Sequence, residues 1–127
     1  MGKKKILLVD DEVDFLILMK KIIISWGYDI ITASNSQEAL AAFQKEKPNI
    51  LIVDYAMPEV NGIELLEKIR SLVGGGVPAI MFAAEPSMKA MEKAKDLRIS
   101  AFIPKISPRM HTHEDLKMAL DLIAKGI

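Results

Sequence analysis

Two runs of aliphatic residues in this chain end in aspartate. Residues 6–9 read Ile-Leu-Leu-Val and lead into Asp10 and Asp11, and residues 50–53 read Ile-Leu-Ile-Val and lead into Asp54. If both runs are buried strands of one parallel sheet, their carboxyl ends meet at one edge, and three carboxylates converge there. Neighbouring carboxylates repel one another, and a hard divalent cation such as Mg²⁺ relieves that repulsion. The pattern therefore predicts a magnesium site for phosphate chemistry, in which one aspartate could itself be the nucleophile.

The hydrophobic period along the chain predicts strands and helices in alternation, which is an α/β pattern. The expected strands are residues 5–9, 29–33, 49–53, 79–82 and 101–103. The expected helices are residues 13–26, 36–45, 63–73, 87–97 and 113–125. Four strands are continuous apolar runs, as expected when helices cover both faces of the sheet, and the second strand resembles an edge strand. The fourth helix has only a thin apolar stripe, Met91, Ala94 and Leu97, and is expected to be lightly anchored.

The composition of the chain limits its possible functions. With 127 residues, of which 50% are hydrophobic and 27% charged, the chain is expected to fold as one domain over residues 1–127. Its 17 basic side chains balance 17 acidic ones, so we expect no direct nucleic-acid binding and no general attraction to membranes. There are no cysteines, which excludes disulfides, thiolate zinc sites and a cysteine nucleophile. Neither an export signal nor a membrane-spanning apolar stretch is evident, so a cytoplasmic location is the default expectation.

A set of residues at the predicted strand ends and loops matches the motif of a known family. In chain order these residues are Asp10, Asp11, Asp54, Met57, Pro58, Gly62 and Lys105. Through them the chain resembles the CheY-like receiver (REC) domain of two-component response regulators, from residue 6 to about residue 124. The resemblance implies a doubly wound five-stranded parallel sheet with the flavodoxin-like strand order 2-1-3-4-5 and helices on both faces. That order places the first and third strands, and hence their aspartates, side by side.

The resemblance also implies a role for each site residue. Asp54 is the expected phosphoacceptor, which takes a phosphoryl group from a histidine of a sensor histidine kinase or phosphotransfer protein. Mg²⁺ would be held by Asp11, Asp54 and the backbone carbonyl of Ala56, with Asp10 acting through water, and Lys105 would contact the phosphoryl oxygens. Such a transfer depends on positioning and charge neutralisation. The chain would be a signalling domain rather than an enzyme, although it could catalyse its own phosphorylation and dephosphorylation, and would signal to an unknown effector or attached output module.

Two positions depart from the family pattern. Ala83 stands where relatives carry a Ser or Thr that bonds the phosphoryl group, while an aromatic residue on the fifth strand, here Phe102, changes rotamer in step. One lost hydrogen bond to a charged group is worth about 1.5–3 kcal/mol, comparable to the free-energy gap of many two-state switches. Pro104 precedes Lys105, whereas relatives have proline after the lysine, often in a cis peptide bond. We therefore expect a weakened conformational response and an atypical path for the loop that carries Lys105.

Other functions stay open at this point. Ala83 favours a pseudo-receiver, a phosphorylation-insensitive module for binding or dimerisation. An aspartate-based phosphatase of the haloacid dehalogenase type would share the Mg²⁺ site, but it needs Asp-x-Asp and the chain has Glu12 two places after Asp10. Taken alone, Asp10 and Asp11 would be explained by the preference for acids at a helix N-terminus.

The first helix carries more apolar residues than one buried face needs. Its predicted core stripe is Phe15, Leu18, Met19, Ile22, Ile23 and Trp26, and beyond it lie Val13, Leu16, Ile17 and Ile24. Excess apolar surface beside the acidic site marks a candidate docking face for the histidine-bearing helices of a partner, or for a homodimer. Coverage by neighbouring side chains is the alternative. The sequence identifies neither the cognate kinase and signal nor the oligomeric state.

Overall fold

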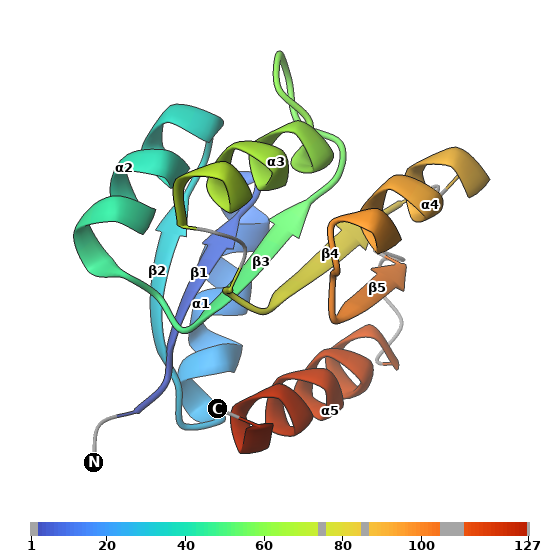
Figure 1. Ribbon diagram of the computed structural model, residues 1–127. Helices are drawn as coiled ribbons and strands as arrows, with labels where there is room; N and C mark the ends of the chain where they lie inside the picture. The colour runs from blue at the N-terminus through green and yellow to red at the C-terminus, as the bar shows by residue number, and fades with distance from the viewer. Residues whose placement is uncertain (1–2, 74–75, 85–86, 105–110, 127) are drawn as a thin grey trace.

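The computed structural model of the chain describes residues 3–73, 76–84, 87–104 and 111–126 (Figure 1). Strands and helices alternate through these residues, as the hydrophobic pattern predicted. In chain order the elements are β1 (Lys5–Val9), α1 (Val13–Ser25), β2 (Asp29–Ala33), α2 (Ser36–Glu46), β3 (Ile50–Asp54), α3 (Gly62–Val73), β4 (Ala79–Ala83), α4 (Met88–Asp96), β5 (Ala101–Pro104) and α5 (His111–Gly126). None of the helices within the described ranges combines the length and the apolar character that crossing a membrane would take.

The strands form one parallel sheet in the order β2-β1-β3-β4-β5. This order confirms the doubly wound, flavodoxin-like topology predicted from the sequence. The apolar residues of β3 and β4 are buried along the whole of each strand, whereas β2 is more exposed and lies at the edge. Because β1 and β3 are neighbours, the segments that follow them begin at the same edge of the sheet.

Two separate apolar clusters show that helices cover both faces of the sheet (Figure 1). One cluster joins the sheet to Phe43 of α2, Leu66 of α3 and Ala94 of α4, and the other joins it to Met19 of α1 and Leu120 of α5. From α4 only alanines, Ala90 and Ala94, are buried, and Met91 of the predicted apolar stripe is 45% exposed. The buried contribution of α4 is therefore small, because alanine offers less apolar area than larger side chains.

Three helix ends are stabilised by local interactions. The Asn35 side chain accepts a hydrogen bond from the Glu38 backbone N–H at 2.9 Å and so caps α2. The Ser87 hydroxyl accepts from the Ala90 backbone N–H at 3.0 Å and caps α4. Gly27 follows α1 with a φ of 96°, a left-handed conformation that glycine adopts without steric cost.

The buried side of α1 differs from the predicted one. Leu16 is only 6% exposed and packs in the core with Met19 and Ile23, so its assignment to the outer face is wrong. Leu18, predicted to be in the core, is 50% exposed. The error has a simple physical cause, since a helix that is apolar almost all round has no unique stripe, and the period alone does not select its buried side.

Candidate functional site

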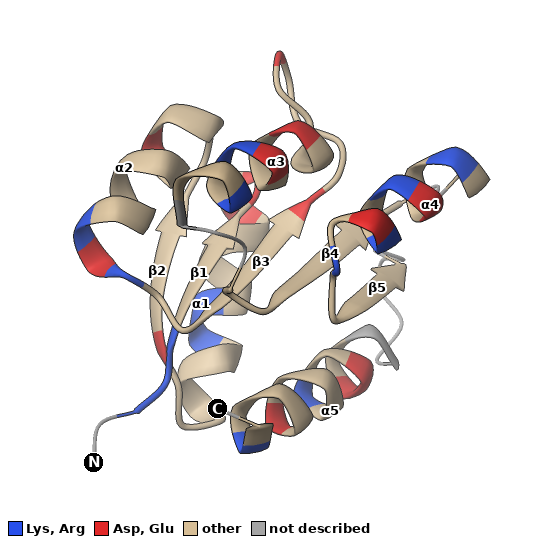
Figure 2. Cartoon of the chain, viewed as in Figure 1, with Lys and Arg blue, Asp and Glu red and all other residues tan. Residues whose placement is uncertain are grey.

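The sheet register brings Asp10 and Asp54 together. Val9 of β1 pairs with Val53 of β3, and each aspartate is the next residue of its chain segment. Asp10 is fully buried and Asp54 is 4% exposed, and they are the buried charged side chains of the described residues. Figure 2 shows acidic residues at the carboxyl ends of these strands. Burial of carboxylates is costly unless hydrogen bonds or a cation compensate for the lost hydration, so their placement here points to a functional site.

Asp10 also shapes the start of α1. Its Oδ1 accepts a hydrogen bond from the Glu12 backbone N–H at 2.9 Å, and its own N–H donates to the Ala33 carbonyl at 3.1 Å. Glu12 is the N-cap residue of α1. The helix-start explanation for Asp10 is therefore correct in part, and it is compatible with a second role because a carboxylate has two oxygens and several lone pairs.

The carboxylate oxygens of three residues lie within 4.8 Å of one another, and these residues are Asp10, Glu12 and Asp54. A set of hard oxygen donors at this spacing fits a divalent cation such as Mg²⁺. Asp11 is exposed and does not belong to the set. Glu12 was missed in the sequence because its approach depends on the turn that Asp10 makes, and a spacing of two residues at a helix start does not reveal that turn.

The roles of three other predicted site residues stay predictions. Ala56 is exposed two residues after Asp54, and the part of its backbone carbonyl in metal binding stays a prediction, as does the metal contact of Asp11. Lys105 lies outside the described residues, together with the loop whose path the proline order was expected to change.

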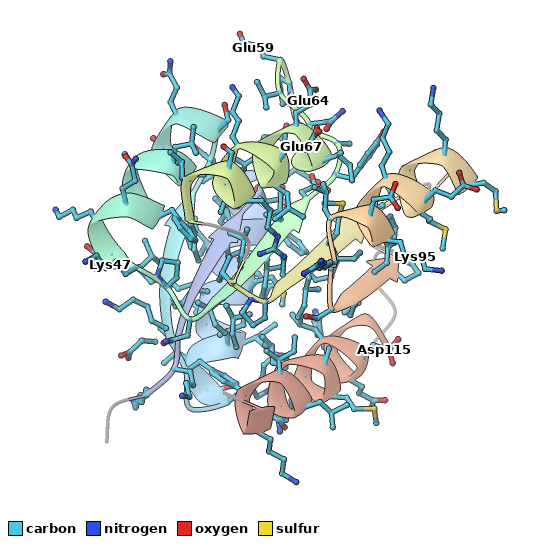
Figure 3. The ribbon with its side chains drawn as sticks, viewed as in Figure 1. Lys47, Glu59, Glu64, Glu67, Lys95 and Asp115 are labelled. Atoms are coloured by element: carbon cyan, nitrogen blue, oxygen red, sulfur yellow. The ribbon has the colours of Figure 1, made fainter. Side chains whose placement is uncertain are left out.

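The loop between β3 and α3 is closed by hydrogen bonds on both sides of the site. The Tyr55 N–H donates to the Phe82 carbonyl of β4 at 2.7 Å, and the Gly62 N–H donates to the Tyr55 carbonyl at 2.8 Å. The Glu64 N–H donates to the Asn61 side chain at 2.9 Å, and the Asn61 N–H donates to the Glu64 carboxylate at 3.3 Å, which forms a capping box. Figure 3 shows Glu59 at the outer tip of this loop, away from the sheet. The backbone around Asp54 is thereby held between β4 and the start of α3.

The switch positions lie on the other side of Asp54. Asp54 pairs with Phe82, so Ala83 is the next residue along the neighbouring strand, and it is 1% exposed. Phe102 is half-buried on β5 and lines a hollow beneath α4 with Met88 and Met91. Ala83 has no hydroxyl to offer at this place. The nearby Ser87 hydroxyl caps α4.

Three of the four residues of the predicted partner face are exposed. Val13, Ile17 and Ile24 are 57%, 52% and 47% exposed and lie on one side of the helix, while Leu18 is also exposed but lies about 100° further round from Ile17. Since α1 begins directly after the acidic cluster, Val13 and Ile17 belong to the part of the helix nearest the site. The surface made by Val13, Ile17 and Ile24 is called the α1 apolar face below.

Comparison with known proteins identifies the class that this fold and site define. The profile of the response regulator receiver domain matches residues 6–117, and the chain belongs to this family. A receiver domain of the CheY-like kind from Methanospirillum hungatei is 30% identical and superimposes with a TM-score of 0.84 over 99% of this chain and 100% of that one.

Two curated relatives extend the comparison. The "Probable transcriptional regulator ycf27" of Cyanophora paradoxa is 36% identical over 83 residues, which are 65% of this chain and 34% of the relative. "Sporulation initiation phosphotransferase F" of Bacillus subtilis is 29% identical over 97 residues, 76% of this chain and 77% of that protein. The chain spans about a third of the length of several curated regulators that it matches. It is thus similar both to a domain of longer regulators and to a protein of comparable size.

Proposed function

We propose that the chain receives a phosphoryl group on Asp54 from a phosphohistidine and relays a two-component signal. The observation that carries this proposal is the buried Asp54 carboxylate at the end of β3, beside Asp10 and Glu12, in a chain of the receiver family. Buried carboxylates grouped at the carboxyl edge of a parallel sheet suit a site for phosphoryl transfer.

In the proposed reaction, a carboxylate oxygen of Asp54 attacks the phosphorus atom of the phosphohistidine. An O–P bond forms, the N–P bond breaks, and its electron pair returns to the imidazole nitrogen. Asp54 is suited to in-line attack because Tyr55 and Gly62 hold the backbone on either side of the loop, which reduces the entropy lost in reaching the reactive geometry. The product is a labile acyl phosphate, so the signal is temporary.

The donor set fits the Mg²⁺ that the family implies, since the clustered side chains are carboxylates, which are hard ligands. Asp10, Asp11, Asp54 and the Ala56 carbonyl would hold it, and Lys105 would contact the phosphoryl oxygens. When bound, Mg²⁺ supplies positive charge between the carboxylates and the incoming phosphoryl group.

Labelling by a small phosphodonor tests the proposal directly. With acetyl phosphate and Mg²⁺, the wild-type chain should gain one phosphoryl group, detected as a mass increase of the intact protein. The Asp54→Asn variant should gain none, and chelation of the cation should suppress labelling of the wild type. Glu59→Gln is a suitable control, because Glu59 stands at the loop tip outside the acidic cluster (Figure 3). Labelling that persists in Asp54→Asn would refute the assignment of the acceptor.

A pseudo-receiver is the second candidate function, and Ala83 is the observation that favours it. In this case the fold would bind a partner, or a second copy of itself, without regard to phosphorylation. Spectral mapping with beryllofluoride and Mg²⁺, a mimic of the aspartyl phosphate, separates the candidates. Shifts that reach α4 and β5 support a switching receiver, and shifts confined to the acidic cluster support the binding module.

The partners proposed for the chain follow from the same function. A sensor histidine kinase or a histidine phosphotransfer protein would dock on the α1 apolar face, where exposed apolar residues adjoin the acidic cluster. A downstream effector would read the phosphorylated state, and the cytoplasm is the location we propose for this exchange.

A further inference from the structure

Glu12 lies at the acidic cluster although the family motif does not require an acid at its position. Its carboxylate is within 4.8 Å of both the Asp10 and the Asp54 carboxylates. Asp10 and Asp54 are buried, whereas Glu12 is exposed and approaches from the start of α1. The cluster therefore contains two buried acids and one exposed acid.

The turn at the start of α1 fixes this approach. The Glu12 backbone N–H donates to Asp10 Oδ1 at 2.9 Å, which ties the position of one acid to the other. The Glu12 side chain does not cap its own helix, although it occupies the N-cap position. A glutamate that leaves this capping role unused and turns toward two buried carboxylates adds negative charge where the charge is already concentrated.

We propose that Glu12 is a third carboxylate of the divalent-cation site and raises the affinity of the unphosphorylated protein for Mg²⁺. This inference rests on the proposed phosphoacceptor function, because it assumes that the cation of that function binds at the same cluster. A further hard oxygen ligand, or a charge just outside the ligands, attracts the cation more strongly.

The proposal predicts changes in two measurable quantities. Glu12→Gln removes the charge and keeps the shape, so it should weaken Mg²⁺ binding about tenfold, the lower end of the range for groups that support metal ligands. The rise in melting temperature produced by added Mg²⁺ should accordingly be smaller than in the wild type.

Calorimetric titration with Mg²⁺ and thermal melting, each on the full chain, provide the test. Asp14→Asn is the matched control, because it removes one exposed acid from the first turn of the same helix, outside the cluster. Weaker binding in Glu12→Gln with near-wild-type binding in Asp14→Asn supports the proposal. Equal weakening in both variants would show a general field effect and overturn it, and so would an unchanged dissociation constant in Glu12→Gln.

Labelling by acetyl phosphate distinguishes failure of this inference from failure of the proposed function. At saturating Mg²⁺, Glu12→Gln should still be labelled on Asp54, since the acceptor is intact. If wild type and Glu12→Gln are labelled and bind Mg²⁺ equally well, the role of Glu12 is wrong and the phosphoacceptor function stands. If the wild type neither binds Mg²⁺ nor accepts a phosphoryl group, both are wrong.

Discussion

Gly62 packs directly against the backbone of Asp54. A Cβ atom at Gly62 would lie 2.5 Å from the Asp54 carbonyl oxygen and 3.0 Å from both the Tyr55 Cα and a methyl group of Val53. No side chain larger than hydrogen fits at this distance without a shift of backbone atoms. The start of α3 and the end of β3 therefore approach each other closely because residue 62 is glycine, and this contact helps to set the position of the proposed acceptor.

Replacement of Gly62 by alanine should consequently disturb both stability and phosphorylation. We expect a loss of about 1–3 kcal/mol, typical of overpacking, because the added methyl group meets backbone rather than a flexible side chain. Labelling by acetyl phosphate should slow in the fraction that is folded. The control is Gly76→Ala, where a Cβ would meet nothing within 4 Å. Equal melting temperatures for the two alanine variants would contradict the packing argument.

Replacement of Lys47 by glycine should raise the stability of the fold, whereas replacement of Gly62 lowers it. Lys47 ends α2 with a φ of 49° and a ψ of 63°, the left-handed conformation that costs least for glycine (Figure 3). Its N–H donates to the Phe43 carbonyl at 3.0 Å, and glycine would keep this bond. Lys47→Gly should therefore stabilise the protein, because it removes a left-handed penalty of about 1–2 kcal/mol, which exceeds the entropic cost of glycine of about 0.5–1 kcal/mol. Lys45→Gly, within the last turn of α2, should destabilise it, and thermal melting of the pair would reveal the contrast.

The pH dependence of stability should contain a contribution from Asp121 of α5. Its Oδ2 accepts a hydrogen bond from the Lys117 ammonium at 2.7 Å, and its Oδ1 accepts from the Tyr28 hydroxyl at 2.7 Å. These two bonds hold the pKa of Asp121 below its usual value, and the bond from Lys117 has the larger effect. Because the folded-state pKa is depressed, the stabilisation is present above the unfolded-state pKa of about 3.9 and is lost as pH falls through the folded-state value.

Melting curves of Asp121→Asn between neutral and strongly acidic pH would measure this contribution. The variant should melt below the wild type at neutral pH, and the difference should vanish in strong acid. Its size should stay within the range of about 0–1 kcal/mol found for exposed ion pairs, since the Asp121 side chain is 47% exposed. Asp115→Asn, at an exposed acid of the same helix, is the control for the loss of one negative charge from α5. A constant offset at every pH would argue against the linkage.

The reliability of sequence reasoning differed between the sheet and the helices for physical reasons. Buried parallel strands appear in the sequence as continuous apolar runs, and their ends carry the aspartates, so β1, β3 and the pair Asp10 and Asp54 were predicted correctly. Which side of α1 faces the core was not, because the helix is apolar almost all round. Glu12 was missed because its place depends on a local turn, closed by one hydrogen bond to Asp10, and residue spacing does not show which way that turn directs the Glu12 side chain.

The corrected orientation of α1 sharpens the test of its outer face. Ile17→Glu places a charge on the exposed face and should leave the melting temperature near that of the wild type, while phosphotransfer from a partner kinase falls. Leu16→Ala removes a buried side chain and should cost about 2–5 kcal/mol. Phosphorylation by acetyl phosphate is the control for Ile17→Glu, since it needs no docked partner and should be unaffected. A folded Ile17→Glu protein with full phosphotransfer would remove the docking role from this face.

Ala83→Ser introduces a hydroxyl beside the proposed acceptor. It tests whether the missing hydroxyl limits the conformational response of α4 and β5 to phosphorylation. Serine adds a single oxygen to a residue that is 1% exposed at the end of β4, whereas threonine would also add a methyl group to a filled space. With beryllofluoride and Mg²⁺ bound, the new hydroxyl can donate to the phosphate mimic, and a hydrogen bond to a charged group contributes about 1.5–3 kcal/mol. A contribution of that size shifts a two-state equilibrium by about 10-fold or more.

Chemical-shift changes at Phe102 and along α4 should therefore be larger in Ala83→Ser than in the wild type. Ala84→Ser, on the exposed neighbour, should leave them at the wild-type level. If Ala83→Ser binds the mimic with no added change at Phe102, the lost hydroxyl is not what limits the response, and the pseudo-receiver gains support.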